Sequence, residues 1–106
     1  MDFISEVYGV TEKFPVAERY GLTNQLRRAA TSVALNIAEG SAAMTDLEFR
    51  RFLGISLRSN YEVMCGFEIA NRLGYCSEST KENILNRSEE LSAMISGFIK
   101  TLTADS

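Results

Sequence analysis

Histidine and tryptophan are absent from this sequence, proline occurs once, and there are only two cysteines. A chain without histidine lacks the most common general acid–base residue of enzymes and a common zinc ligand. Cys65 and Cys76 are too far apart for a CxxC motif, so the two thiols predict neither a structural zinc site nor a redox pair. We interpret Cys65 as a small buried hydrophobic residue.

Other signatures of catalysis are also missing. The sequence has no glycine-rich phosphate loop, and no nucleophile stands in a recognisable pattern with a base. A pair of metal ions inside a helical bundle would require Glu-x-x-His on two helices, which a chain without histidine cannot supply. We therefore expect a protein that is not an enzyme, with no metal, no cofactor and no small-molecule substrate.

Long apolar segments are missing as well. No run approaches the roughly 20 apolar residues that a membrane span needs. The first residues, MDFISEVYG, lack the basic region followed by an apolar stretch that marks a signal peptide. These features predict a cytoplasmic protein that does not enter a membrane.

The 106 residues are 45% hydrophobic and carry a formal net charge of -3. This length and composition predict one domain, spanning residues 1–106, with a real hydrophobic core. A net negative charge opposes unspecific nucleic-acid binding by the whole surface, because such binding depends on summed positive charge.

Apolar residues recur at helical spacing in four segments. The first covers about residues 2–13 and ends before Pro15, with a short helical turn following at 16–20. The second begins with Thr23 as a plausible N-cap and stops at Gly40. The third runs from a Thr45–Glu48 capping box to Gly74, and the fourth from a Ser79–Glu82 capping box to the C-terminus. Short connections between four helices predict an all-α, antiparallel up-down-up-down four-helix bundle.

The third segment has the longest apolar stripe. Small residues at 56, 59 and 66 lie on or beside it, and we expect them to let neighbouring helices approach closely. Phe52, Ile55 and Ile69 lie beside the stripe and predict a contact with another subunit, because a bundle of this size buries one stripe per helix. The core stripe itself comprises Phe49, Leu53, Ser56, Asn60, Val63, Phe67 and Ala70.

Three stretches resemble a known family: FPVAERYGLTNQLRRAATSVALNIAEG at 14–40, EFRRFLGISLRSNYEV at 48–63 and NRLGY at 71–75. They are similar to the proteins named after the 23S rRNA intervening sequence, which resemble the accessory proteins of diversity-generating retroelements. The resemblance implies a four-helix bundle, usually with a longer first helix, that assembles as a cyclic homopentamer. For the retroelement proteins it also implies binding to a reverse transcriptase and to nucleic acid.

Several polar residues of the second and third segments lie at or near the apolar stripes. A carboxylate at the C-terminal end of a helix opposes the helix dipole, so Glu39 needs a partner. Glu62 beside the stripe also needs a donor, and an adjacent guanidinium suits a bidentate ion pair. We predict a structural ion pair between Glu62 and an arginine of the 27–28 pair, and a structural rather than acid–base role for Glu39. The candidate structural polar network comprises Arg27, Arg28, Asn36, Glu39 and Glu62.

A second group of arginines lies on the third segment. Arg51, Arg58 and Arg72 share one heptad position, with Cys65 at the remaining place, and Arg50 joins them at the edge. This face is either a solvated or subunit-contact surface, or a surface that recognises phosphates. The candidate nucleic-acid or partner surface is thus Arg50, Arg51, Arg58 and Arg72.

The sequence predicts a small, non-enzymatic, self-associating interaction or scaffold protein. The alternative is an RNA- or DNA-binding accessory protein of a reverse transcriptase. The partner, whether nucleic acid or protein, is not specified by the residues.

Overall fold

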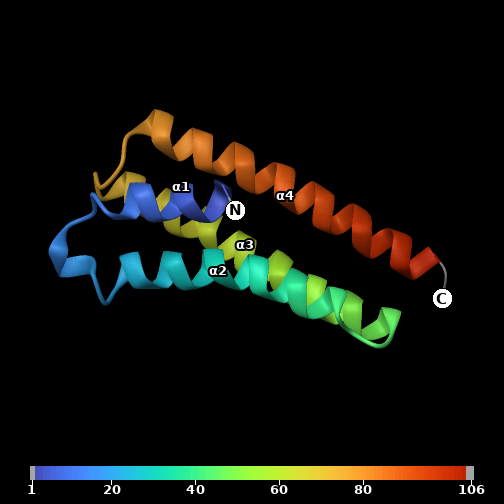
Figure 1. Ribbon diagram of the computed structural model, residues 1–106. Coiled ribbons are helices and arrows are strands. Elements are labelled where there is room, and N and C mark those ends of the chain that lie inside the picture. Colours follow the sequence, from blue (N-terminus) through green and yellow to red (C-terminus); the bar gives the residue numbers. More distant parts are fainter. Residues whose placement is uncertain (1, 105–106) are drawn as a thin grey trace.

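The computed structural model describes residues 2–104, and every regular element in that range is helical. In Figure 1, α1 and α3 run in one direction, and α2 and α4 run in the other. This arrangement is the expected all-α, up-down-up-down four-helix bundle. The elements are α1 (Asp2–Thr11), the 3₁₀ turn η1 (Val16–Glu18), α2 (Leu22–Ser41), α3 (Asp46–Arg72) and α4 (Glu78–Ala104).

The four helices differ in length, and this divides the core into two parts. α1 has 10 residues, whereas α3 and α4 have 27 each, so α1 lies along only one half of the bundle (Figure 1). In that half, Val7 of α1 packs in one apolar cluster with Leu26, Phe67 and Ile84. The other half has a separate three-helix cluster around Val33, Leu53 and Ile95.

The predicted core stripe of α3 is confirmed. Six of its seven members are buried, and the seventh, Phe49, is half-buried at the end of the helix. Asn60, a polar member, is fully buried: its Nδ2 donates to the carbonyl of Ser88 at 2.7 Å and to Ser92 Oγ at 2.8 Å. The stripe therefore holds α4 by polar contacts as well as by apolar packing.

Two helix ends of α3 agree with the sequence-based prediction. Thr45 caps its N-terminus, because the Thr45 hydroxyl accepts from the Glu48 backbone N–H at 3.1 Å. At the other end Gly74 has a φ of +79°, which favours glycine. The N–H groups of Gly74 and Tyr75 donate to the carbonyls of Asn71 and Ala70, the paired bonds of a Schellman motif.

Three other predicted helix ends are wrong. The α4 cap is Ser77 instead of Ser79, since Ser77 Oγ accepts from the Thr80 N–H at 3.1 Å. Thr23 lies inside α2 and is buried, while Gly21 occupies the N-cap position. Gly40 does not end α2, which continues to Ser41.

Gly40 serves packing instead of termination. A Cβ at Gly40 would lie 2.7 Å from Phe49 Cδ1 and 3.0 Å from Phe52 Cβ, so only glycine lets α3 approach this closely. Further along, the Ser32 and Ser59 hydroxyls are hydrogen-bonded at 2.9 Å. These short contacts confirm that small residues bring α2 and α3 together.

Glu18 joins three parts of the fold. Its Oε1 accepts from the Leu22 backbone N–H at 3.1 Å, at the start of α2, and its Oε2 accepts from the Tyr75 hydroxyl at 2.8 Å, beyond α3. The bond from Leu22, followed by the bond from Tyr75, lowers the pKa of the Glu18 carboxyl. The same bond to Glu18 raises the pKa of Tyr75. The ionised carboxylate therefore stabilises this end of the bundle.

We expect Glu18→Gln to flatten the acid side of the stability profile. Since the folded-state pKa of Glu18 is lowered, its contribution is present above the ordinary carboxyl pKa and is lost as the pH falls through the lowered value. Thermal unfolding measured from neutral to acid pH should show a smaller decline in Tm for the variant than for the parent. The control is Glu39→Gln, at an exposed carboxylate, and an unchanged acid decline in Glu18→Gln would contradict the assignment.

Candidate interaction surfaces

The outward side of α3 carries a continuous stripe of exposed residues spaced alternately by four and three positions, the spacing of one helix face. Arg51, Arg58 and Arg72 all belong to it, whereas Arg50 is half-buried and lies off it. Cys65 is exposed on the same stripe, so its interpretation as a buried residue is wrong. The outer stripe of α3 is defined as Arg51, Ile55, Arg58, Glu62, Cys65, Ile69 and Arg72.

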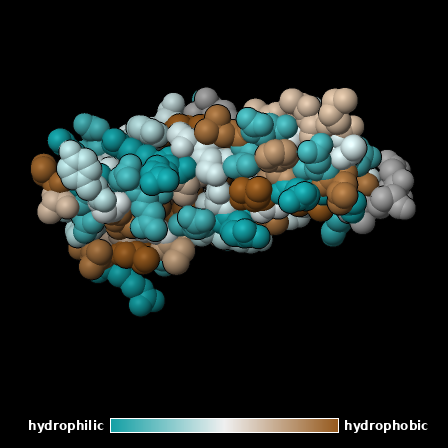
Figure 2. All heavy atoms as spheres, turned by 90° about the horizontal axis from the view of Figure 1, so that it is seen from below, coloured by the Kyte–Doolittle hydropathy of each residue, from teal (hydrophilic) through white to brown (hydrophobic). Residues whose placement is uncertain are grey.

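The outer stripe combines apolar and charged side chains. Ile55 and Ile69 are 42% and 45% exposed, and each is followed three positions later by an arginine. Seen from the side of α2, apolar residues break the hydrophilic surface in several separate places (Figure 2). Isolated exposed apolar residues are ordinary, but a mixed row of isoleucine and arginine along a rigid helix resembles the composition of protein interfaces.

Arg27 binds α1 and not Glu62, so that part of the predicted ion pair is wrong. The Arg27 Nη2 lies 3.1 Å from Glu12 Oε2, and its Nε donates to Thr11 Oγ1 at 2.9 Å. The guanidinium also lies 4.6 Å from the centre of the Tyr8 ring. α1 has no basic residue in its own last turn, and Arg27 places a cation at that C-terminus, where the helix dipole favours one.

Arg28 and Glu62 are both exposed and line a hollow of about 500 Å³ between α2 and α3, together with Gln25. Within residues 2–104 no ion pair joins the two side chains. The alternative prediction, an ion pair between Glu62 and Arg28, is therefore wrong as well.

The remaining members of the predicted network do not meet the arginines. Asn36 Nδ2 donates to the carbonyl and the hydroxyl of Ser32, both at 2.9 Å, and thereby extends the Ser32–Ser59 contact. Glu39 is exposed, and its side chain has no hydrogen bond or ion pair in the described part of the chain. The five residues are thus divided among four separate places.

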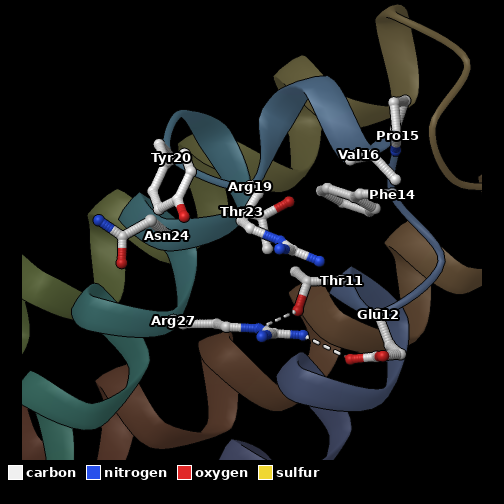
Figure 3. A pocket seen from close by; sticks show the side chains of 10 residues that line it. All are labelled: Thr11, Glu12, Phe14, Pro15, Val16, Arg19, Tyr20, Thr23, Asn24 and Arg27. Carbon is white, nitrogen blue, oxygen red and sulfur yellow. Dashed lines mark hydrogen bonds and ion pairs between the residues drawn. The ribbon is translucent and has the colours of Figure 1, made fainter.

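A pocket of about 310 Å³ lies where α1, η1 and the start of α2 meet (Figure 3). The side chains of Arg19 and Arg27 extend into it one above the other, Thr23 lies beside Arg19, and Phe14 closes one side. Sequence reasoning identified Arg27 but missed Arg19 and Thr23. Arg19 precedes α2 and Arg27 lies within it, so the helical period of α2 does not relate the two arginines.

Residues 2–104 hold neither a metal-binding cluster nor a membrane-spanning helix. No group of three or more Cys, Asp or Glu side chains lies close enough to hold a metal ion. None of the helices in this range combines the length and the apolar character of a membrane-spanning segment.

Comparison with known proteins agrees with the overall fold. A solved structure of a protein with unknown function from the S23 ribosomal protein family of Bacteroides thetaiotaomicron is similar at 27% sequence identity, with a TM-score of 0.85 and 93% of each chain covered. No curated protein matches this chain. The family model for the 23S rRNA-intervening sequence protein matches residues 1–97. Because this match covers nearly the whole chain, the protein belongs to the 23S rRNA-intervening sequence protein family.

Proposed function

We propose that this protein is a cytoplasmic, non-enzymatic scaffold that self-associates, as a cyclic homopentamer, and presents the assembled surface to a macromolecular partner. The observation that carries the proposal is the outer stripe of α3. Its two half-exposed isoleucines lie on a rigid helix of 27 residues, between arginines that a neighbouring subunit can pair.

The chemistry of the stripe favours another protein surface over solvent alone. Burying an isoleucine side chain is worth about 1.5–3 kcal/mol, so leaving two of them half exposed on one face forgoes part of that stabilisation. Acidic residues are also available on α4, where Glu89 and Glu90 are exposed; Glu82 is exposed too, but it lies 3.6 Å from Lys81 Nζ. A ring in which α3 of one subunit contacts its neighbour would bury the isoleucines and pair the arginines.

We expect Ile55→Glu to reduce the assembly to a smaller species, because it buries a carboxylate in the proposed contact. The mass should be measured by light scattering at micromolar concentration, with circular dichroism to verify that the helices are intact. Met94→Glu makes the same kind of change at a 70% exposed apolar residue of α4, outside the stripe, and serves as control. Equal masses for parent and Ile55→Glu would show that the stripe is not the contact.

Nucleic-acid binding is the second candidate, and the exposed arginines of the outer stripe favour it. Arg51, Arg58 and Arg72 present three guanidinium groups along one helix, and a ring of subunits would repeat them. Such a surface would contact phosphates more than bases, giving weak sequence preference and a strong dependence on salt.

For this candidate, titration with structured RNA at low and moderate salt is expected to show binding that weakens as salt rises. The variant Arg51→Glu/Arg58→Glu should lose the binding while keeping the mass of the parent. Loss of the assembly in the variant would instead favour a subunit contact. If no RNA binds even at low salt, the nucleic-acid candidate is wrong and the partner is a protein.

A further inference from the structure

The pocket at the junction of α1, η1 and α2 is lined by two cationic side chains and one anionic side chain, so it has an excess positive charge. Its only charged lining residues are Glu12, Arg19 and Arg27. Glu12 forms an ion pair with Arg27, with 3.1 Å between Oε2 and Nη2. The Arg19 side chain has no hydrogen bond or ion pair in residues 2–104. Figure 3 shows the two guanidinium groups reaching the same space, one above the other. Two cations facing one another in a hollow are stabilised by an anion between them.

Thr23 supplies a third polar group to the pocket. The residue is only 7% exposed, and its hydroxyl has no hydrogen-bond partner in the described part of the chain. In Figure 3 the hydroxyl points into the pocket beside the Arg19 guanidinium. Water still reaches this hydroxyl, which is therefore free to donate to a bound acceptor.

We propose that this pocket binds a phosphate group, either as free phosphate or as the phosphate of a small monoester. The donors are the Arg19 and Arg27 guanidinium groups and the Thr23 hydroxyl, and the Asn24 side chain lies at the rim. The site is independent of the proposed assembly, since none of these residues belongs to the outer stripe of α3.

The directions of the donors select phosphate over carboxylate. The two guanidinium groups lie one above the other and the Thr23 hydroxyl lies above the Arg19 group, so the donors are spread over the pocket instead of gathered at one point. A planar carboxylate accepts best from donors in its own plane, whereas the oxygens of a tetrahedral phosphate point in different directions and suit such a set. The volume of about 310 Å³ is at the lower end for small-molecule sites and admits a phosphate with a modest attached group.

The test is a titration of the ¹⁵N-labelled protein with inorganic phosphate against chloride at constant ionic strength, followed by ¹H–¹⁵N NMR. We expect saturable shifts at the Thr23 amide and at the Arg19 Nε–H, which has no partner in residues 2–104, whereas the Arg27 Nε–H already donates to Thr11 Oγ1. Arg19→Gln should weaken binding about tenfold or more, since it removes a charge-assisted donor. Lys13→Gln removes the same charge from an exposed neighbour that does not line the pocket, and should leave binding unchanged.

Three outcomes would overturn the site. These are the absence of a saturable shift, an equal loss in Lys13→Gln and Arg19→Gln, and binding of acetate as tight as that of phosphate. A parallel titration with a nucleoside monophosphate separates the two sources of the phosphate. Tighter binding than inorganic phosphate assigns the site to a phosphate ester, and equal or weaker binding assigns it to free phosphate.

Discussion

Replacing Asn60 with aspartate is expected to lower the free energy of unfolding by at least about 3 kcal/mol at neutral pH. Asn60 is fully buried, and its Nδ2 donates both to the Ser88 carbonyl and to Ser92 Oγ. An aspartate carboxylate has no proton to donate, so it would face the Ser88 carbonyl oxygen while carrying a charge away from water. The loss should be measured by chemical denaturation of the assembled protein at fixed concentration.

A matched control for this change exists at Asn71, also in α3. Asn71 Nδ2 donates to the Cys76 carbonyl at 3.2 Å, but this residue is only half-buried, so water can solvate an introduced carboxylate. Asn71→Asp should therefore cost about 1 kcal/mol or less. Because burial raises the pKa of an introduced carboxyl, the defect of Asn60→Asp should shrink as the pH falls and the acid becomes a donor. A cost at Asn60 no larger than that at Asn71 would refute the polar core contact.

Gly66→Ala is expected to destabilise the bundle by about 1–3 kcal/mol. An added Cβ would lie 2.2 Å from Leu26 Cδ2 and 3.0 Å from Leu26 Cγ, where no side chain fits without movement. Leu26 is itself 1% exposed in the four-helix half of the core, so it has little room to withdraw. The substitution would force α2 and α3 apart where Gly66 faces Leu26.

Gly54→Ala is the control, since Gly54 lies in the same helix and an added Cβ would meet nothing within 4 Å. Alanine is favoured over glycine inside a helix by about 1 kcal/mol, so this variant should be slightly more stable than the parent. Leu26→Ala alone should cost about 2–5 kcal/mol, and the double variant with Gly66→Ala should cost less than the sum. Additive losses, or a stabilising Gly66→Ala, would contradict the proposed contact.

The parts of the fold that could be predicted depend on residues near one another in the sequence. Thr45 caps α3 because its partner, the Glu48 N–H, is three positions away, and Gly74 ends the helix by its own backbone conformation. The periodic core stripe is local information of the same kind. Gly40 was misinterpreted because the reason for glycine there is the ring of Phe49 on another helix.

The polar contacts could be predicted less well, since they depend on which helices become neighbours. Arg27 and Glu62 both lie beside apolar stripes, but Arg27 reaches the C-terminal end of α1 instead of α3. The spacing correctly placed Arg51, Arg58 and Arg72 on one exposed face of α3, but Arg50, which was predicted to join them, is half-buried and lies off that face. The pocket with Arg19 and Thr23 was missed, because it forms only when η1 turns back over α1.

The central claim is that this protein self-associates, and the mass of the purified protein in solution tests it most directly. The chain has a mass of 11.8 kDa, and light scattering at micromolar concentration should give five times that value for the proposed cyclic pentamer. The mass should remain constant on moderate dilution, as expected for a closed ring. A mass of 11.8 kDa across the micromolar range would contradict self-association, and with it the proposed role of the outer stripe of α3.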